Sequence, residues 1–95
     1  MNRIAIIDDS DINLTLLKHL VIRQGGCEPH LFEDAREGLK WCIYNEPDLI
    51  IVDYMMPDLD GLGFIEEFRT APHRATIPIL MITANDDKEV RYEAL

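Results

Sequence analysis

The sequence predicts an α/β fold in which helices alternate with the strands of a parallel sheet. Four apolar runs, at residues 3–7, 27–32, 48–53 and 77–82, have the length and composition of strands. Stretches with a helical spacing of apolar residues separate these runs. Strands that alternate with helices favour parallel pairing and right-handed crossovers. A chain of 95 residues is long enough for one such domain, which we expect to cover residues 1–95.

The first strand is the run 3–7, and a helix follows it from Ser10 to the glycines Gly25 and Gly26. Glycine favours helix termination because it readily adopts the left-handed conformation found there. Five apolar residues with helical spacing predict the inward face of this helix: Ile12, Leu16, Leu17, Leu20 and Val21.

The second strand, 27–32, contains Pro29. Proline has no backbone N–H to donate, so we expect this strand at an edge of the sheet. Asp34 and Glu37 then have the spacing of a capping box, which predicts a second helix. Its predicted inward residues are Leu39, Cys42 and Ile43.

The third strand, 48–53, is an apolar run between two aspartates, as is typical of a parallel strand buried on both faces. Asp60 can cap the third helix, and Pro72 closes it. That helix carries Leu62, Ile65 and Phe68. After the fourth strand, 77–82, the capping pattern recurs and predicts a last helix over 86–95.

The charge of the chain limits the classes of function. It has 9 basic and 18 acidic residues, a formal net charge of −9. We expect no direct nucleic-acid binding, because that needs clustered Lys and Arg. The two cysteines, Cys27 and Cys42, lack the spacing of a zinc site. The apolar run near the N-terminus is too short for a signal peptide or a membrane span, so we expect a cytoplasmic protein with no membrane partner.

Acidic residues follow two of the predicted strands. Asp8 and Asp9 end the first strand, Asp53 ends the third, and Thr83 ends the fourth. If strands one and three are neighbours, three carboxylates meet at one rim of the sheet. Carboxylates this close repel each other unless a cation intervenes, and a hard cation such as Mg²⁺ prefers oxygen ligands. A carboxylate beside such a metal can accept a phosphoryl group.

A simpler interpretation of these residues remains open. Asp8, Asp9 and Ser10 have the side chains that cap a helix, and the first helix begins just after them. Thr83 could likewise form only a local hydrogen bond to the backbone. Two acidic strand ends together with a hydroxyl on a third favour the pocket.

Three motifs together resemble the receiver domain of two-component response regulators. They are Asp8-Asp9 after an apolar strand, Asp53-Tyr-Met-Met-Pro57 followed by Asp60-Gly61, and Ile82-Thr83-Ala84. Asn13, Leu16 and Leu17 also match the family's usual first helix. The resemblance runs over the whole chain. It implies a flavodoxin-like, doubly wound sheet with strand order 2-1-3-4-5, which places strand two at an edge.

The resemblance implies a role for each of the three aspartates at the predicted pocket. Asp53 matches the aspartate that takes a phosphoryl group from the phosphohistidine of a kinase. Asp8 and Asp9 match the pair that holds Mg²⁺ or Mn²⁺, Asp9 directly and Asp8 largely through water. Asp53 and the backbone carbonyl of Met55 match the other protein ligands of that metal.

The resemblance also implies roles for three positions beside the pocket. Thr83 matches the hydroxyl that moves onto the phosphoryl group and so reports phosphorylation. Met55 and Asn85 match positions beside the site that tune the lifetime of the acyl phosphate. The implied partners are a sensor histidine kinase or phosphotransfer protein and a downstream effector domain or protein. The domain is expected to be a switch and not a turnover enzyme.

One departure from the family pattern concerns the C-terminal part. Receivers have a fifth strand that ends in a lysine, followed by a fifth helix, and the chain stops before both. Lys18, Lys40 and Lys88 do not match that lysine. We therefore expect a C-terminally incomplete domain in which strand four is an open edge. Downstream residues, a swapped segment or a second copy of the chain would cover that edge.

Two other functions use some of the same residues. Haloacid-dehalogenase-like phosphatases also use an aspartate after an apolar strand, but they need a second aspartate where this chain has Met55. A pseudo-receiver would bind partners without being phosphorylated. Such domains usually lose pocket acids, whereas this chain keeps them.

Overall fold

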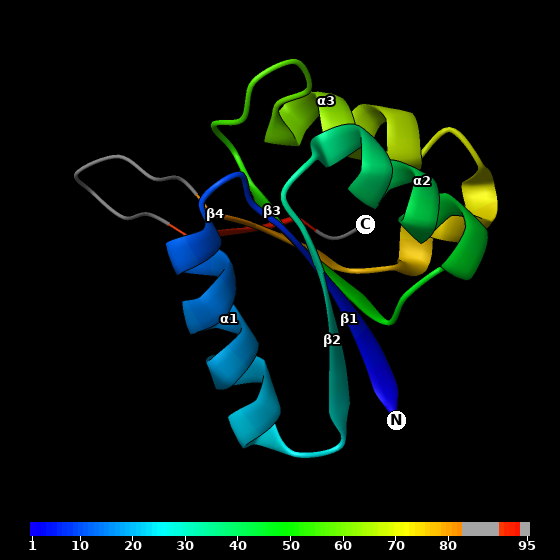
Figure 1. Ribbon diagram of the computed structural model, residues 1–95. Coiled ribbons are helices and arrows are strands. Elements are labelled where there is room, and N and C mark those ends of the chain that lie inside the picture. Colours follow the sequence, from blue (N-terminus) through cyan, green and yellow to red (C-terminus); the bar gives the residue numbers. More distant parts are fainter. Residues whose placement is uncertain (83–89, 94–95) are drawn as a thin grey trace.

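The computed structural model describes residues 1–82 and 90–93. Strands in this part of the chain form one sheet in the order β2-β1-β3-β4-β5, with helices on both faces (Figure 1). The strands are β1 Asn2–Ile7, β2 Cys27–Phe32, β3 Leu49–Asp53, β4 Ile79–Ile82 and β5 Val90–Glu93. The helices are α1 Asp11–Gln24, α2 Ala35–Asn45 and α3 Gly61–Phe68, and a short 3₁₀ helix spans Pro72–Thr76.

The first four strands have the predicted parallel arrangement. β1 pairs with both β2 and β3, and β3 pairs with β4. This confirms the predicted order 2-1-3-4. β2 is the outer strand on its side of the sheet, which agrees with Pro29 in its middle.

The end of the chain differs from the prediction. Residues 90–93 form β5, which pairs antiparallel with β4, so the helix predicted there is wrong. The rest of that predicted helix lies outside the described residues. The prediction that β4 has an open edge is also wrong, because β5 occupies that edge (Figure 1). An outer strand offers unpaired backbone N–H and C=O groups, and a neighbouring strand satisfies them.

The helices begin at side-chain caps. The Ser10 side chain accepts from the backbone N–H of Asn13, Asp34 from that of Arg36, and Asp60 from that of Gly63. Each bond satisfies one of the N–H groups that the first turn of a helix leaves free. α1 ends at Gly25, whose φ of 79° lies in the region that glycine adopts without strain.

The apolar core has two layers, one on each face of the sheet. The layer under α2 and α3 is the larger one, and its buried residues include Ile50, Val52, Phe64, Phe68 and Ile79. The layer under α1 is smaller, with Ile4, Ile6, Leu14, Val21 and Ile51 buried. Figure 1 shows α1 alone on its face, and α2 with α3 together on the other. No helix in the described ranges is long and apolar enough to cross a membrane.

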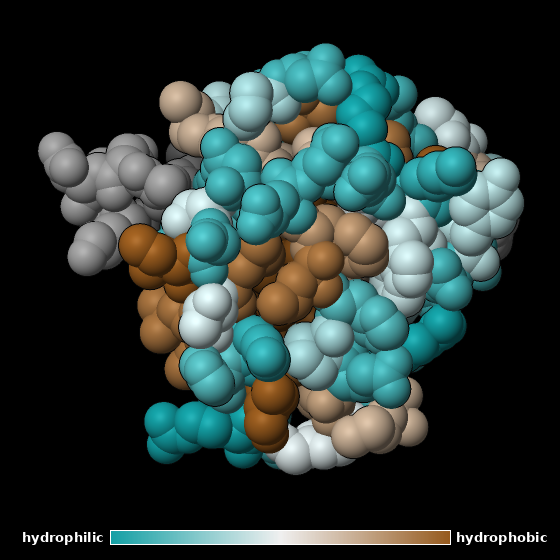
Figure 2. Space-filling model, in the orientation of Figure 1, coloured by the Kyte–Doolittle hydropathy of each residue, from teal (hydrophilic) through white to brown (hydrophobic). Residues whose placement is uncertain are grey.

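α1 turns only part of the predicted face to the sheet. Val21 is buried and Leu17 packs partly against the same layer, as predicted, but Leu14 is buried as well. Three residues of the predicted inward face are 80%, 57% and 48% exposed: Ile12, Leu16 and Leu20. Both sets have helical spacing, so only the position of the sheet decides which set is covered. Figure 2 shows the resulting apolar atoms (brown) along α1. In α3, likewise, Phe64 is buried while Leu62 is half exposed.

Candidate functional site

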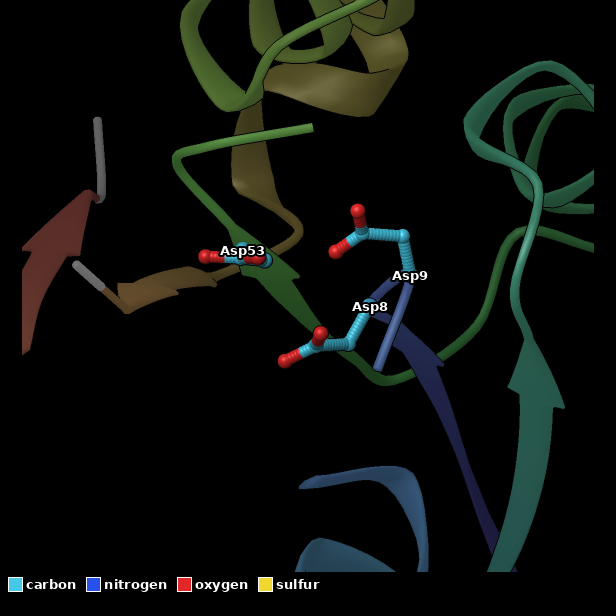
Figure 3. Close-up of side chains that lie close together, drawn as sticks. All are labelled: Asp8, Asp9 and Asp53. Atoms are coloured by element: carbon cyan, nitrogen blue, oxygen red, sulfur yellow. The ribbon is translucent and has the colours of Figure 1, made fainter. Parts of the chain in front are cut away.

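Three carboxylates meet where β1 and β3 end. Asp8 and Asp9 directly follow β1, and Asp53 is the last residue of β3. The two strands are parallel neighbours with Ile7 opposite Val52, so their carboxyl ends lie side by side. One oxygen from each carboxylate lies within 4.8 Å of the others. Figure 3 shows the three side chains projecting into the same space.

Asp53 is a nearly buried acid, with 4% of its surface exposed. The backbone N–H of Met55 donates to its Oδ1 over 3.3 Å. Burial raises the pKa of Asp53 from 3.8 to about 6, and the charges of Asp8 and Asp9 add to that increase. The backbone N–H groups of Met55 and Tyr54 oppose it. Near neutral pH, the carboxylate is therefore ionised but poorly stabilised by the protein alone.

Asp8 is buried more deeply than Asp53, with 2% of its surface exposed. The backbone N–H of Ser10 donates to Asp8 Oδ1 over 2.9 Å, and the side-chain amide of Asn13 donates to Oδ2 over 3.3 Å. Burial raises the pKa of Asp8, while these two donors lower it. Asp9, in contrast, is exposed at the mouth of the cluster.

The cap of α1 is separate from the acidic cluster. Ser10 Oγ accepts the N–H of Asn13, so Ser10 is the capping residue. Asp8 accepts the N–H of Ser10 itself, which lies before the helix. The simpler interpretation thus holds for Ser10, and it leaves the carboxylates of Asp8 and Asp9 unexplained by capping.

A close approach of α3 holds the loop after Asp53 in place. The N–H of Gly61 donates to the carbonyl of Tyr54 over 3.0 Å. A Cβ at Gly61 would lie 2.9 Å from both the Asp53 carbonyl oxygen and the Tyr54 Cα. These are backbone atoms that cannot rotate away, so only glycine allows α3 to begin this close to the acid.

The donor set fits a hard divalent cation. All three groups are carboxylates, and three negative charges so close together destabilise each other. A small cation with oxygen ligands removes that repulsion, and Mg²⁺ is bound in proteins by one or two carboxylates together with water and phosphate oxygens. Burial, and then the same repulsion, raises the pKa of Asp53.

The remaining predicted site residues are placed only in part. Met55 follows the acid by two positions, and its side chain is 62% exposed. Thr83 and Asn85 lie outside the described residues. β4, which ends at Ile82, does reach the cluster, since Ile82 lies opposite Asp53 and its carbonyl accepts the N–H of Tyr54 over 2.7 Å.

Asn13 was not expected at the pocket, although its position held a signal. It is the third residue of the helix that Ser10 caps, and the side chain at that place commonly turns back toward the residues before the helix. Here it reaches Asp8 instead of the capping residue.

Comparisons with known proteins agree with the geometry. A family model described as the response regulator receiver domain matches residues 4–95. The chain is 36% identical over 96 residues to "Cyclic di-GMP phosphodiesterase response regulator RpfG" of Xanthomonas campestris, a match that covers 97% of the chain and 25% of that protein. Matches to two other curated relatives cover 20% and 35% of those proteins, so the chain spans between a fifth and about a third of each.

Solved structures show the same fold. The N-terminal domain of a response regulator receiver protein from Methanoculleus marisnigri matches with a TM-score of 0.78 and 30% identity, over 93% of this chain and 73% of that one. Chemotaxis protein CheY4 of Vibrio cholerae matches with a TM-score of 0.79 and 29% identity, over 90% of this chain and 70% of that one. The family match spans nearly the whole sequence, and the chain therefore belongs to the response regulator receiver domain family of two-component systems.

Proposed function

We propose that Asp53 is the phosphoacceptor of this receiver domain and that Asp8, Asp9 and Asp53 hold the Mg²⁺ that the transfer needs. The observation that carries the proposal is the convergence of the three carboxylates within 4.8 Å at the ends of adjacent parallel strands. Mn²⁺ has the same preference for oxygen ligands and would occupy the same site.

The position of Asp53 suits a nucleophile. It is the last residue of β3, in which Ile50 and Val52 are fully buried. Its Oδ1 accepts the N–H of Met55, which orients the carboxylate at the strand end. A carboxylate that is already held in one orientation beside a phosphoryl donor loses less conformational entropy when it attacks.

The proposed reaction is the transfer of a phosphoryl group from a phosphohistidine to Asp53. An Asp53 carboxylate oxygen forms a bond to phosphorus, the bond between phosphorus and the imidazole nitrogen breaks, and the nitrogen keeps the electron pair. Bound Mg²⁺ would neutralise negative charge on the transferring group. Asp8 and Asp9 would be its ligands, and the Met55 carbonyl is a further proposed ligand. Thr83 is the proposed switch hydroxyl, and Met55 and Asn85 are proposed to set the lifetime of the product.

The proposed partners follow from this chemistry. The donor is a sensor histidine kinase or a histidine phosphotransfer protein, and the output is an effector domain or protein. The relative from Xanthomonas campestris is described as both a phosphodiesterase and a response regulator, which supports an output in the same polypeptide. The acidic chain, with a net charge of −9, suits basic protein surfaces better than nucleic acid.

Phosphorylation with a small donor tests the proposal. The intact protein is incubated with acetyl phosphate and MgCl₂, the acyl phosphate is trapped by borohydride reduction, and the modified residue is identified by peptide mass spectrometry. We expect the label on Asp53 alone. Asp53→Asn should abolish it, because a carboxamide is not a competent nucleophile here.

Asp48→Asn is the matched control. Asp48 is exposed and precedes β3, whereas Asp53 ends the same strand. This variant should be labelled like the parent. Labelling that persists in Asp53→Asn would show that another residue accepts the group. A folded parent that binds Mg²⁺ but takes no label from acetyl phosphate or from a phosphorylated kinase would favour the pseudo-receiver.

A further inference from the structure

The Asn13 side chain links α1 to the acidic cluster. Its Nδ2 donates to Asp8 Oδ2 over 3.3 Å, while the N–H of Ser10 donates to Asp8 Oδ1 over 2.9 Å. Each oxygen of the Asp8 carboxylate therefore accepts one hydrogen bond, from the capping residue Ser10 or from Asn13 in the first turn of α1. Two bonds to two different oxygens fix both the position and the rotation of the carboxylate plane.

Asp8 needs such support more than its neighbours do. It is 2% exposed, so water cannot solvate it freely, and Asp9 and Asp53 carry like charges within 4.8 Å. A buried carboxylate without donors is destabilised strongly and tends to turn away or take up a proton. The amide of Asn13 is a side-chain donor that reaches Asp8 and opposes this effect.

The two bonds still leave Asp8 able to bind a cation. A carboxylate oxygen has two lone pairs, and each Asp8 oxygen uses one of them toward α1. The oxygens of Asp9 and Asp53 lie within 4.8 Å of an Asp8 oxygen. The bonds to α1 thus hold Asp8 in the cluster without using all of its acceptor capacity.

The backbone and the side chain of Asn13 have separable roles. The backbone N–H donates to Ser10 Oγ and so caps α1, which a residue of any type except proline can do. Only the side-chain amide reaches Asp8. A substitution at this position therefore changes the bond to Asp8 and leaves the cap of the helix intact.

We propose that Asn13 is a positioning residue of the metal pocket, which holds Asp8 in the orientation that binds Mg²⁺. The inference rests on the proposed metal site and adds a residue to it. Residues that support a metal ligand through a hydrogen bond typically change metal affinity about 10–100-fold when removed. The bond from Asn13 is long, at 3.3 Å, so we expect the lower end of that range.

The test is a titration of the intact, metal-free protein with MgCl₂ by calorimetry. Asn13→Ala should weaken Mg²⁺ binding about tenfold. Asn13→Gln keeps a primary amide and should recover part of the affinity. Thr15→Ala is the matched control, because Thr15 is exposed on the same helix and its hydroxyl donates to the Asp11 carbonyl. It should bind Mg²⁺ like the parent.

A second measurement separates positioning from general stability. The unfolding temperature is recorded for each variant with and without MgCl₂. Positioning predicts that the unfolding temperature of Asn13→Ala rises less on adding Mg²⁺ than that of the parent does, whatever the lost bond to Asp8 costs without metal. Equal Mg²⁺ affinity in the parent and Asn13→Ala would overturn the inference while leaving the metal site intact. A parent that binds no Mg²⁺ would overturn both. Asn13→Gln as weak as Asn13→Ala, with both destabilised without metal, would show a purely structural role.

Discussion

Removing the charge of Asp53 should stabilise the metal-free protein at neutral pH. Asp53 is 4% exposed, and burial together with the charges of Asp8 and Asp9 raises its pKa from 3.8 to about 6. An ionised Asp53 is therefore held less favourably in the folded chain than in the unfolded chain. Asp53→Asn keeps the shape and the acceptor oxygen for the Met55 N–H but removes the charge.

The sign of the pH dependence follows from the two pKa values. Between pH 3.8 and about 6, the folded chain binds the proton of Asp53 more tightly than the unfolded chain does. Stability therefore falls as the pH rises through this window, and the full penalty is present above it. The gain from Asp53→Asn should be small near pH 4 and reach its maximum above pH 6.5.

The magnitude has an upper bound of about 3 kcal/mol, because one pKa unit corresponds to about 1.4 kcal/mol. Asp9 is exposed beside Asp53, so solvent and salt reach the cluster and screen part of this energy. We expect a gain of about 1–2 kcal/mol at pH 7.5. Added Mg²⁺ should reduce the gain, because the cation relieves the same repulsion in the parent protein.

Urea unfolding in EDTA measures the effect. The fluorescence of Trp41, the one tryptophan of the chain, can follow the transition at pH 4, 5.5 and 7.5. Asp34→Asn is a matched control, since Asp34 is exposed and asparagine caps a helix about as well as aspartate. It should change stability by less than about 0.5 kcal/mol at each pH. A gain from Asp53→Asn that is absent at pH 7.5, or equally large at pH 4, would refute the reasoning.

Three further predictions concern α3. Gly61→Ala should destabilise the fold by about 1–3 kcal/mol and weaken Mg²⁺ binding, because a Cβ there meets backbone atoms at 2.9 Å. Gly63→Ala is its control, since that Cβ meets the flexible end of Leu59, and the better helix propensity of alanine offsets the contact. Asp60→Ala should cost about 1 kcal/mol in urea unfolding, whereas Asp60→Asn should be nearly neutral. Phe64→Ala should cost about 3–5 kcal/mol, because Phe64 is fully buried.

Much of the architecture could be predicted from the sequence because it depends on local pattern. Apolar runs marked β1 to β4, and Ser10, Asp34 and Asp60 marked the helix starts. Pro29 marked the edge strand. The carboxyl ends of neighbouring parallel strands lie at one rim, so the meeting of the three acids followed once β1 and β3 were taken as neighbours.

Features that depend on which surfaces meet could not be predicted in this way. α1 has apolar residues on more than one face, and Leu14 is buried instead of Leu16 because the sheet covers that side. The capping pattern near the C-terminus favoured a helix, but residues 90–93 pair with the free edge of β4. Backbone hydrogen bonding across strands is a long-range interaction, and local propensity does not report it.

The sequence by itself determined which carboxylates share the rim, because strand ends are encoded by local apolar runs. Only the tertiary structure decided how each carboxylate is held. Burial under the surrounding elements raises the pKa of Asp53 to about 6. The approach of α3 requires Gly61, and the first turn of α1 brings Asn13 to Asp8. Distances of about 3 Å between side chains from different elements depend on the packing of the whole fold, and residue spacing does not contain them.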